Sequence, residues 1–224
     1  SQPSVGDFQR AYQSLAAETG RILSIHVSSG FSGTVEAARQ AARALGERCR
    51  IEVIDSGTVS MALGIAVIAA ARAARDGADL DACAEAARSV LRRERLTVGL
   101  DTLEYLRRGG RIGRAQAFLG GLLRLKPIIT IRDGEAFPLA RVRTRRKALE
   151  EMLTICLADD AIAEAVVMQA TTPDDAAYLA EELRRRRPGV AVHLGRFGPV
   201  LGVHGGPGML GLLVVLAEEP RAQP

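Results

Sequence analysis

The stretch "ILSIHVSSGFSGTVEAARQAARAL", residues 22–45, joins an apolar run to an amphipathic pattern through a turn of small residues. The apolar run 22–27 predicts a strand, and the helical spacing from about residue 33 predicts a helix that ends near residue 45. A second strand is predicted at "IEVIDS", residues 51–56. Strands that alternate with helices and are continuously apolar predict an α/β fold with a parallel sheet covered on both faces.

The turn itself, "SSGFSGT" at residues 28–34, is the first candidate site. Ser32 or Thr34 could cap the following helix by accepting one of its free N–H groups, which is the commonest use of such residues. Alternatively, small residues, exposed N–H groups and the positive end of the helix dipole form a site for an anion. The residues of the turn alone leave both uses open.

The rest of the chain predicts two domains, residues 1–94 and 95–224. The N-terminal domain combines two strands with four helices, and the C-terminal domain is predicted to be a mixed or antiparallel α+β domain. The latter contains a hairpin that turns at Asp133-Gly134, and two apolar strands are predicted around the glycine-rich turn within residues 198–216. Helices are expected at 8–18, 59–75, 79–94, 143–157 and 173–187. Strands are expected at 96–102, 163–170 and 190–195, and the hairpin covers 126–142.

Composition excludes some classes of function. The formal net charge is +4 and the pI about 9.3, but a recognition motif and stacking aromatics for nucleic acid are missing. Three scattered cysteines have no metal-ligand spacing and indicate buried thiols in a reducing compartment. No signal-peptide pattern opens the sequence, and its longest apolar stretch, residues 61–71, is too short to span a bilayer. We therefore expect a cytoplasmic protein that binds no nucleic acid and does not insert stably into membranes.

Seven motifs occur in one order along the chain. They are "SQPSVGDFQRAY", "SSGFSGTVEAA", "IDSGTVSMALG", "LDTLEYLRRGGRIG", "LLRLKPIITIRDGE", "RVRTRRKALE" and "GPVLGVHGGPGMLG". Together they resemble the DegV family of bacterial fatty-acid-binding proteins, the lipid-carrying subunits of fatty acid kinase. The resemblance implies a DegV-like fold with the ligand tunnel between the two domains. Family members usually carry a strand and a threonine before the position of Ser1. The N-terminal sheet is therefore expected to lack its front strand, through omission or natural shortening.

The resemblance also implies the site. Ser32 is the expected ligand of the fatty acid carboxylate, and Arg143 is expected at the pocket mouth, where it would dock a partner kinase. The full ligand-binding set implied is Ser1, Ser28, Ser29, Ser32, Gly33, Thr34, Arg111 and His204. Burying a sixteen-carbon tail is worth on the order of 12 kcal/mol before association costs, so the tail should set affinity and Ser32 the orientation. Apolar runs at 61–71, 117–125 and 212–216 are either tunnel wall or ordinary core.

Two functions of different class follow. In the first, the protein is a carrier without catalysis, cofactor or metal, and a separate ATP-dependent kinase forms the acyl phosphate. In the second, Ser32, His204 and Asp55 form the triad of a serine hydrolase acting on lipid esters. "GFSGT" nearly matches the nucleophile-elbow pattern but has Thr34 in place of the final glycine, which favours the carrier.

Overall fold

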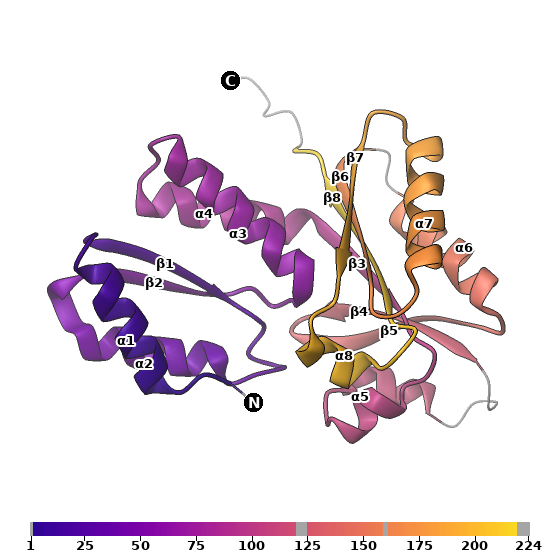
Figure 1. Cartoon of the computed structure of the whole chain (residues 1–224), viewed down its shortest axis with the longest axis horizontal. Helices are drawn as coiled ribbons and strands as arrows, with labels where there is room; N and C mark the ends of the chain where they lie inside the picture. The colour runs from indigo at the N-terminus through magenta and orange to yellow at the C-terminus, as the bar shows by residue number, and fades with distance from the viewer. Residues whose placement is uncertain (1, 120–124, 159–160, 219–224) are drawn as a thin grey trace. The chain divides into compact units, whose positions relative to one another are not determined.

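The structure is a computed structural model that describes residues 2–119, 125–158 and 161–218. The chain forms two compact units, Ser1–Arg92 and Arg93–Pro224, whose helices and strands are labelled in Figure 1. Helix α4 (Leu80–Arg93) runs directly into strand β3 (Glu94–Gly99) without a linker. For this reason the predicted domain boundary after residue 94 falls inside β3.

The first unit is an α/β unit, as the stretch 22–45 predicted. Its elements are α1 (Val5–Ala16), β1 (Arg21–His26), α2 (Thr34–Leu45), the short 3-10 helix η1 (Gly46–Arg48), β2 (Arg50–Asp55), α3 (Ser60–Arg75) and α4. Among the described residues of this unit, β1 and β2 form a two-stranded parallel sheet, in register from Arg21 opposite Arg50 to His26 opposite Asp55. Helices α1 and α2 lie on one side of this sheet and α3 and α4 on the other (Figure 1).

Small side chains let the first pair of helices approach the sheet closely. Helix α1 begins with a capping box between Ser4 and Asp7, which fixes its start. The buried core beneath α1 and α2 consists of Tyr12, Ile22, Ala38, Ala41, Leu45 and Cys49. Alanines on the inner face of α2 allow this contact because they occupy little space between helix and strand.

The second unit contains a larger mixed sheet. Its elements are β3, α5 (Glu104–Arg108), the 3-10 helix η2 (Gly113–Phe118), β4 (Lys126–Arg132), β5 (Glu135–Val142), α6 (Arg145–Cys156), β6 (Ile162–Gln169), α7 (Pro173–Arg186), β7 (Ala191–Arg196), α8 (Pro199–Gly205) and β8 (Leu210–Leu216). The strand order is β5-β4-β3-β8-β6-β7, and only β6 and β7 are parallel among the pairs within residues 93–119, 125–158 and 161–218. Helices α6 and α7 pack on one face of this sheet.

Two sequence predictions in this unit have different outcomes. The hairpin at Asp133-Gly134 is confirmed, because both residues have positive φ (51° and 75°), as a two-residue type I′ turn needs. Of the two strands predicted within 198–216, the second is confirmed as β8, whereas the first is wrong, because that segment is helix α8. Pro199 is the first residue of this helix, where the N–H that proline lacks would have no partner within the helix. Gly206 ends the helix at φ 77°.

Helices long and apolar enough to cross a membrane are absent from the described residues.

Candidate functional site

The loops that follow β1 and β2 are joined by main-chain hydrogen bonds. The carboxylate of Asp55, at the end of β2, accepts the N–H of Ser29 at 3.2 Å and the N–H of Gly57 at 3.0 Å. The N–H of Ser28 donates to the carbonyl of Thr58 at 3.0 Å. The carboxyl ends of neighbouring parallel strands commonly build ligand sites, and here Asp55 holds the two loops against each other.

Ser28 forms the inside of the 28–34 turn. Its side chain is buried, and its hydroxyl accepts the N–H of Gly30 at 3.1 Å. Its carbonyl accepts the N–H groups of Phe31 at 3.0 Å and Ser32 at 3.1 Å. Ser28 therefore shapes the turn from within, whereas Ser29 is exposed on its outside.

Ser32 and Thr34 bond to each other rather than to the helix. Their hydroxyl oxygens are 2.8 Å apart. The N-cap of α2 is Gly33, and no side chain caps the helix there. The capping interpretation of the turn is therefore wrong, because no side chain of the described residues caps this helix. Such an arrangement suits an anion, because the N–H groups at the start of a helix can donate hydrogen bonds to it and the positive end of the helix dipole attracts its charge.

The side chain of Gln2, from another segment, approaches Gly33 closely. A Cβ atom at this position would lie 2.3 Å from Oε1 of Gln2. The N-terminal segment thus lies against the turn, a contact that the sequence pattern did not reveal. The predicted ligand residue Ser1 lies outside the described residues.

Arg111 and His204 come together within the second unit. The guanidinium of Arg111 donates to the carbonyl of Gly109 at 2.9 Å. A Cβ atom on Gly109 would lie 2.3 Å from Nδ1 of His204, so the histidine packs directly against that loop. His204 lies in the last turn of α8, one residue before the helix ends.

The imidazole of His204 has an unused nitrogen. Its Nδ1 is buried and has no hydrogen-bond partner among the described residues. Burial lowers the pKa of His204, and the nearby positive charge of Arg111 lowers it further. The neutral imidazole is therefore favoured near neutral pH.

Three of the four arginines of "RVRTRR", Arg143, Arg145 and Arg146, have different environments. Arg143 is exposed and has no ion pair or hydrogen bond within the described part of the chain. Arg146 pairs with Glu150 one turn along α6 at 3.2 Å, as an exposed helix pair. Arg145 is half-buried and pairs with Asp175 at 2.9 Å.

Arg145 also holds the turn that follows α8. Its guanidinium donates to the carbonyl of Gly208 at 2.7 Å and to the hydroxyl of Thr172 at 3.2 Å. It therefore positions the segment after His204, a role that the sequence analysis left unassigned. The fork geometry of arginine explains this role, since one side chain can donate to several acceptors in a plane.

The structure thus assembles two sets of predicted site residues, one in each unit. The first set is Ser28, Ser29, Ser32, Gly33 and Thr34, and the second is Arg111 and His204. Asp55, the acid of the hydrolase hypothesis, accepts hydrogen bonds from two N–H groups of its own unit.

Among the described residues no group of three or more His, Cys, Asp or Glu side chains could hold a metal ion. The three cysteines are free and buried, as predicted.

Similar proteins share this fold across nearly the whole chain. The family model described as "Uncharacterised protein, DegV family" matches residues 1–217. A DegV domain-containing protein of Streptomyces coelicolor is 40% identical over 219 residues, which span 96% of this chain and 77% of that protein.

Two solved structures extend the comparison. A structure from Thermus thermophilus, described as fatty acid binding of a DegV family protein, superposes with a TM-score of 0.90 at 34% identity, covering 97% of this chain and 78% of that one. DegV from Bacillus subtilis, described as a fatty acid binding protein, gives a TM-score of 0.85 at 30% identity, covering 96% and 77%. With its small parallel sheet, its larger mixed sheet and these relatives, the chain belongs to the DegV family.

Proposed function

We propose that this protein is a fatty-acid carrier without catalysis of its own. It binds a long-chain fatty acid with the carboxylate at Ser32 and presents that carboxylate to a separate ATP-dependent kinase. The observation that carries the proposal is the Ser32–Thr34 hydroxyl pair at the uncapped N-terminus of α2. The relatives from Thermus thermophilus and Bacillus subtilis, described as fatty-acid-binding, support the ligand class.

The hydroxyl pair has the donor that a carboxylate requires. Each hydroxyl carries one proton, and a bond between Ser32 and Thr34 uses only one of the two. The second proton can be donated to a carboxylate oxygen, and such charge-assisted bonds are about twice as strong as neutral ones. Helix α2 has 12 residues, which is long enough for its dipole to favour an anion at this end.

Head group and tail then have different roles. Head-group bonds of about 1–3 kcal/mol fix orientation, whereas the burial of a long tail supplies most of the affinity. Residues Leu212 and Val214 of the predicted wall segment 212–216 belong to the core beneath α6 and α7, so for these two the interpretation as ordinary core holds. Part of the segment 117–125 lies outside the described residues. The segment 61–71 forms the middle of α3.

Arg111, His204 and Arg143 complete the proposal. Arg111 and His204 are proposed as further polar contacts for the head group or the acyl phosphate formed on it. Arg143, exposed and without a partner in the described residues, is proposed to dock the kinase. Arg143→Ala should keep fatty-acid affinity and lower acyl-phosphate formation, with a defect that shrinks as salt rises. Arg146→Ala is the matched control, because its side chain already pairs with Glu150.

The decisive experiment is native mass spectrometry followed by denaturing lipid extraction. The purified protein should contain a stoichiometric fatty acid, or should take up added palmitate or oleate. Ser32→Ala should weaken binding about 5- to 100-fold, the equivalent of 1–3 kcal/mol, without unfolding the protein. A protein that neither carries nor takes up a fatty acid would refute the carrier function. Covalent labelling of Ser32 by a fluorophosphonate would instead favour the hydrolase.

A further inference from the structure

The turn between α8 and β8, residues 206–209, is held by side chains at Gly208. The carbonyl of Gly208 accepts a hydrogen bond from Nη1 of Arg145 at 2.7 Å. Its N–H donates to the hydroxyl of Thr171 at 3.0 Å. Side chains from other segments therefore fix both main-chain polar groups of this residue.

The carboxylate of Asp101 lies against the same glycine. A Cβ atom on Gly208 would be 2.2 Å from Oδ2 of Asp101, so a side chain there would displace the carboxylate. The other oxygen, Oδ1, accepts a hydrogen bond from the ammonium group of Lys126 at 2.7 Å. Asp101, which follows strand β3, thus connects the turn at Gly208 to Lys126 at the start of β4.

Asp101 also acts on the arginine that holds Gly208. Its Oδ1 lies 3.8 Å from Nη1 of Arg145, the atom that donates to Gly208. The Nε atom of the same guanidinium bonds to Asp175 at 2.9 Å. The guanidinium thus lies between two carboxylates, and each attracts it because the charges are opposite. Without Asp101, Asp175 alone would attract Arg145, and its bond to Gly208 would weaken.

Helix α8 ends at this turn and carries His204. Gly206 is the C-cap of the helix, two residues before Gly208. The ring of His204 packs against the loop at Gly109. Because residues 205–207 alone separate His204 from Gly208, a shift of the turn would move the imidazole relative to that loop.

We propose that Asp101 is a positioning residue for His204 and acts through the turn at Gly208. This inference rests on the proposed function, in which His204 contacts the fatty-acid head group. Asp101 does not contact the fatty acid in this role; it fixes the end of α8 so that the imidazole keeps one orientation. Loss of Asp101 should therefore change the surroundings of His204 and of a bound carboxylate. Fatty-acid affinity, which the tail sets, should stay nearly unchanged.

The first test is an NMR titration of the imidazole groups in Asp101→Ala. The ring of His204 should become more exposed, which raises its pKa toward the ordinary value of about 6.5. Removal of a negative charge alone would lower this pKa, because a carboxylate favours the charged imidazole. A rise in the pKa therefore reports movement of the ring and not the change in charge.

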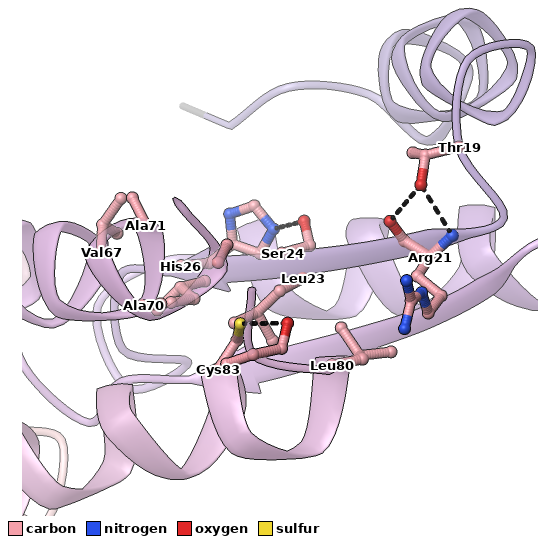
Figure 2. Close-up of a pocket in the computed structure, with 13 residues that line it drawn as sticks. Thr19, Arg21, Leu23, Ser24, His26, Val67, Ala70, Ala71, Leu80 and Cys83 are labelled. Atoms are coloured by element: carbon pink, nitrogen blue, oxygen red, sulfur yellow. Dashed lines mark hydrogen bonds between the residues drawn. The ribbon is translucent and has the colours of Figure 1, made fainter. Parts of the chain in front are cut away.

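His26 provides an internal reference in the same spectra. It belongs to the first unit, lines the cavity that Figure 2 shows, and is bonded to Ser24 at 2.7 Å. Its pKa should be the same in the wild type and in Asp101→Ala, because none of the contacts of Asp101 described above involves the first unit.

Two milder variants test the same turn. Asp101→Asn keeps the shape of the side chain and one oxygen acceptor, so the pKa of His204 should lie between those of the wild type and Asp101→Ala. Thr171→Val removes the acceptor of the Gly208 N–H and should shift the pKa of His204 upward by a smaller amount. If Asp101→Ala does not fold, these two variants decide the question, and no upward shift in either would refute the proposal.

Glu182→Ala is the matched control. Glu182 also accepts hydrogen bonds from cations in the second unit, Arg185 at 2.7 Å and Arg186 at 2.9 Å. Both partners lie on its own helix, α7, so its loss removes a similar set of interactions without touching the turn at Gly208. The pKa of His204 should be unchanged in this variant.

The second test uses oleate that is isotope-labelled at its carboxyl carbon. The NMR signal of this carbon in the bound state should move in Asp101→Ala in the same direction as in His204→Ala. The dissociation constant for oleate should change by no more than about threefold, because the tail supplies most of the affinity. Glu182→Ala should change neither the signal nor the affinity.

Three results would overturn the proposal. These are an unchanged or lowered pKa of His204 in Asp101→Ala, an equal rise in Glu182→Ala, and an unmoved carboxyl signal in an Asp101→Ala protein that binds oleate. If the wild type takes up no oleate, the proposed function fails. The titration of His204 needs no ligand, so it still decides whether Asp101 positions the ring.

Discussion

The two glycine-rich turns of the molecule are held in different ways. The 28–34 turn is held by main-chain bonds and the carboxylate of Asp55, and within the described residues the hydroxyls of Ser32 and Thr34 bond to each other. The turn after α8 is held by side chains, with Tyr105 packed against Gly206 and Arg145 bonded to Gly208. Because main-chain bonds hold the 28–34 turn, its hydroxyls are not needed to fix the turn and can bind a ligand. Both turns also depend on residues distant in sequence, Asp55 for the first and Tyr105 and Arg145 for the second.

The largest effect should come from filling the second turn. Gly206 has φ 77°, and a Cβ there would lie 2.3 Å from the ring of Tyr105. Gly206→Val should lower the free energy of unfolding by about 3 kcal/mol or more, through backbone strain and overpacking. Urea denaturation measures this loss. Gly202→Ala is the control, because nothing lies near its Cβ position, and it should be neutral or slightly stabilising. Equal stability of the two variants would contradict the side-chain account of this turn.

Removing the acceptor of the first turn should cost less. Asp55→Ala leaves the N–H groups of Ser29 and Gly57 without their carboxylate acceptor. We expect this loss to lower the free energy of unfolding by about 1–3 kcal/mol. The same variant should loosen the 28–34 turn and weaken fatty-acid binding. Thermal denaturation and lipid uptake measure the two effects. If lipid uptake were lost while stability stayed unchanged, Asp55 would touch the ligand directly instead of positioning the turn.

Arg145 and Arg146 provide a sharper comparison within one motif. Arg145→Ala removes the pair with Asp175 and the bond to Gly208, and should destabilise by about 1–2 kcal/mol. Arg146→Ala removes one exposed helix pair and should change stability by no more than about 0.5 kcal/mol. Denaturation midpoints of the two variants test this order. A larger effect at Arg146 would refute the structural role of Arg145.

The smallest effect concerns pH. Burial lowers the pKa of both His26 and His204 below the ordinary value, so the folded state binds fewer protons than the unfolded state. Stability contributed by the neutral rings is therefore fully present above about pH 6.5 and is lost as pH falls toward the folded pKa values. NMR titration should find both pKa values below 6.5. His204→Gln should flatten part of the decline in stability, and a raised pKa at either ring would contradict its burial.

Much of the fold could be predicted from local patterns. The strand at 22–27, the following helix and the hairpin at Asp133-Gly134 all depend on neighbouring residues, so periodicity and turn chemistry were sufficient. Segment 198–205 was mistaken for a strand because its apolar residues are too few to distinguish the two periods. In the structure it is a short helix with Val200 and Val203 exposed.

The sequence by itself determined the α/β class, the position of the 28–34 turn and the family, because these follow from local periodicity and from motifs in order. The tertiary structure alone decided what the polar residues do. Thr34 pairs with Ser32 and does not cap α2, Asp55 holds two N–H groups, and Arg145 reaches Gly208 across 63 positions of the chain. Hydrogen-bond partners are chosen by distance in space, and the pattern of residues along a chain does not contain that distance.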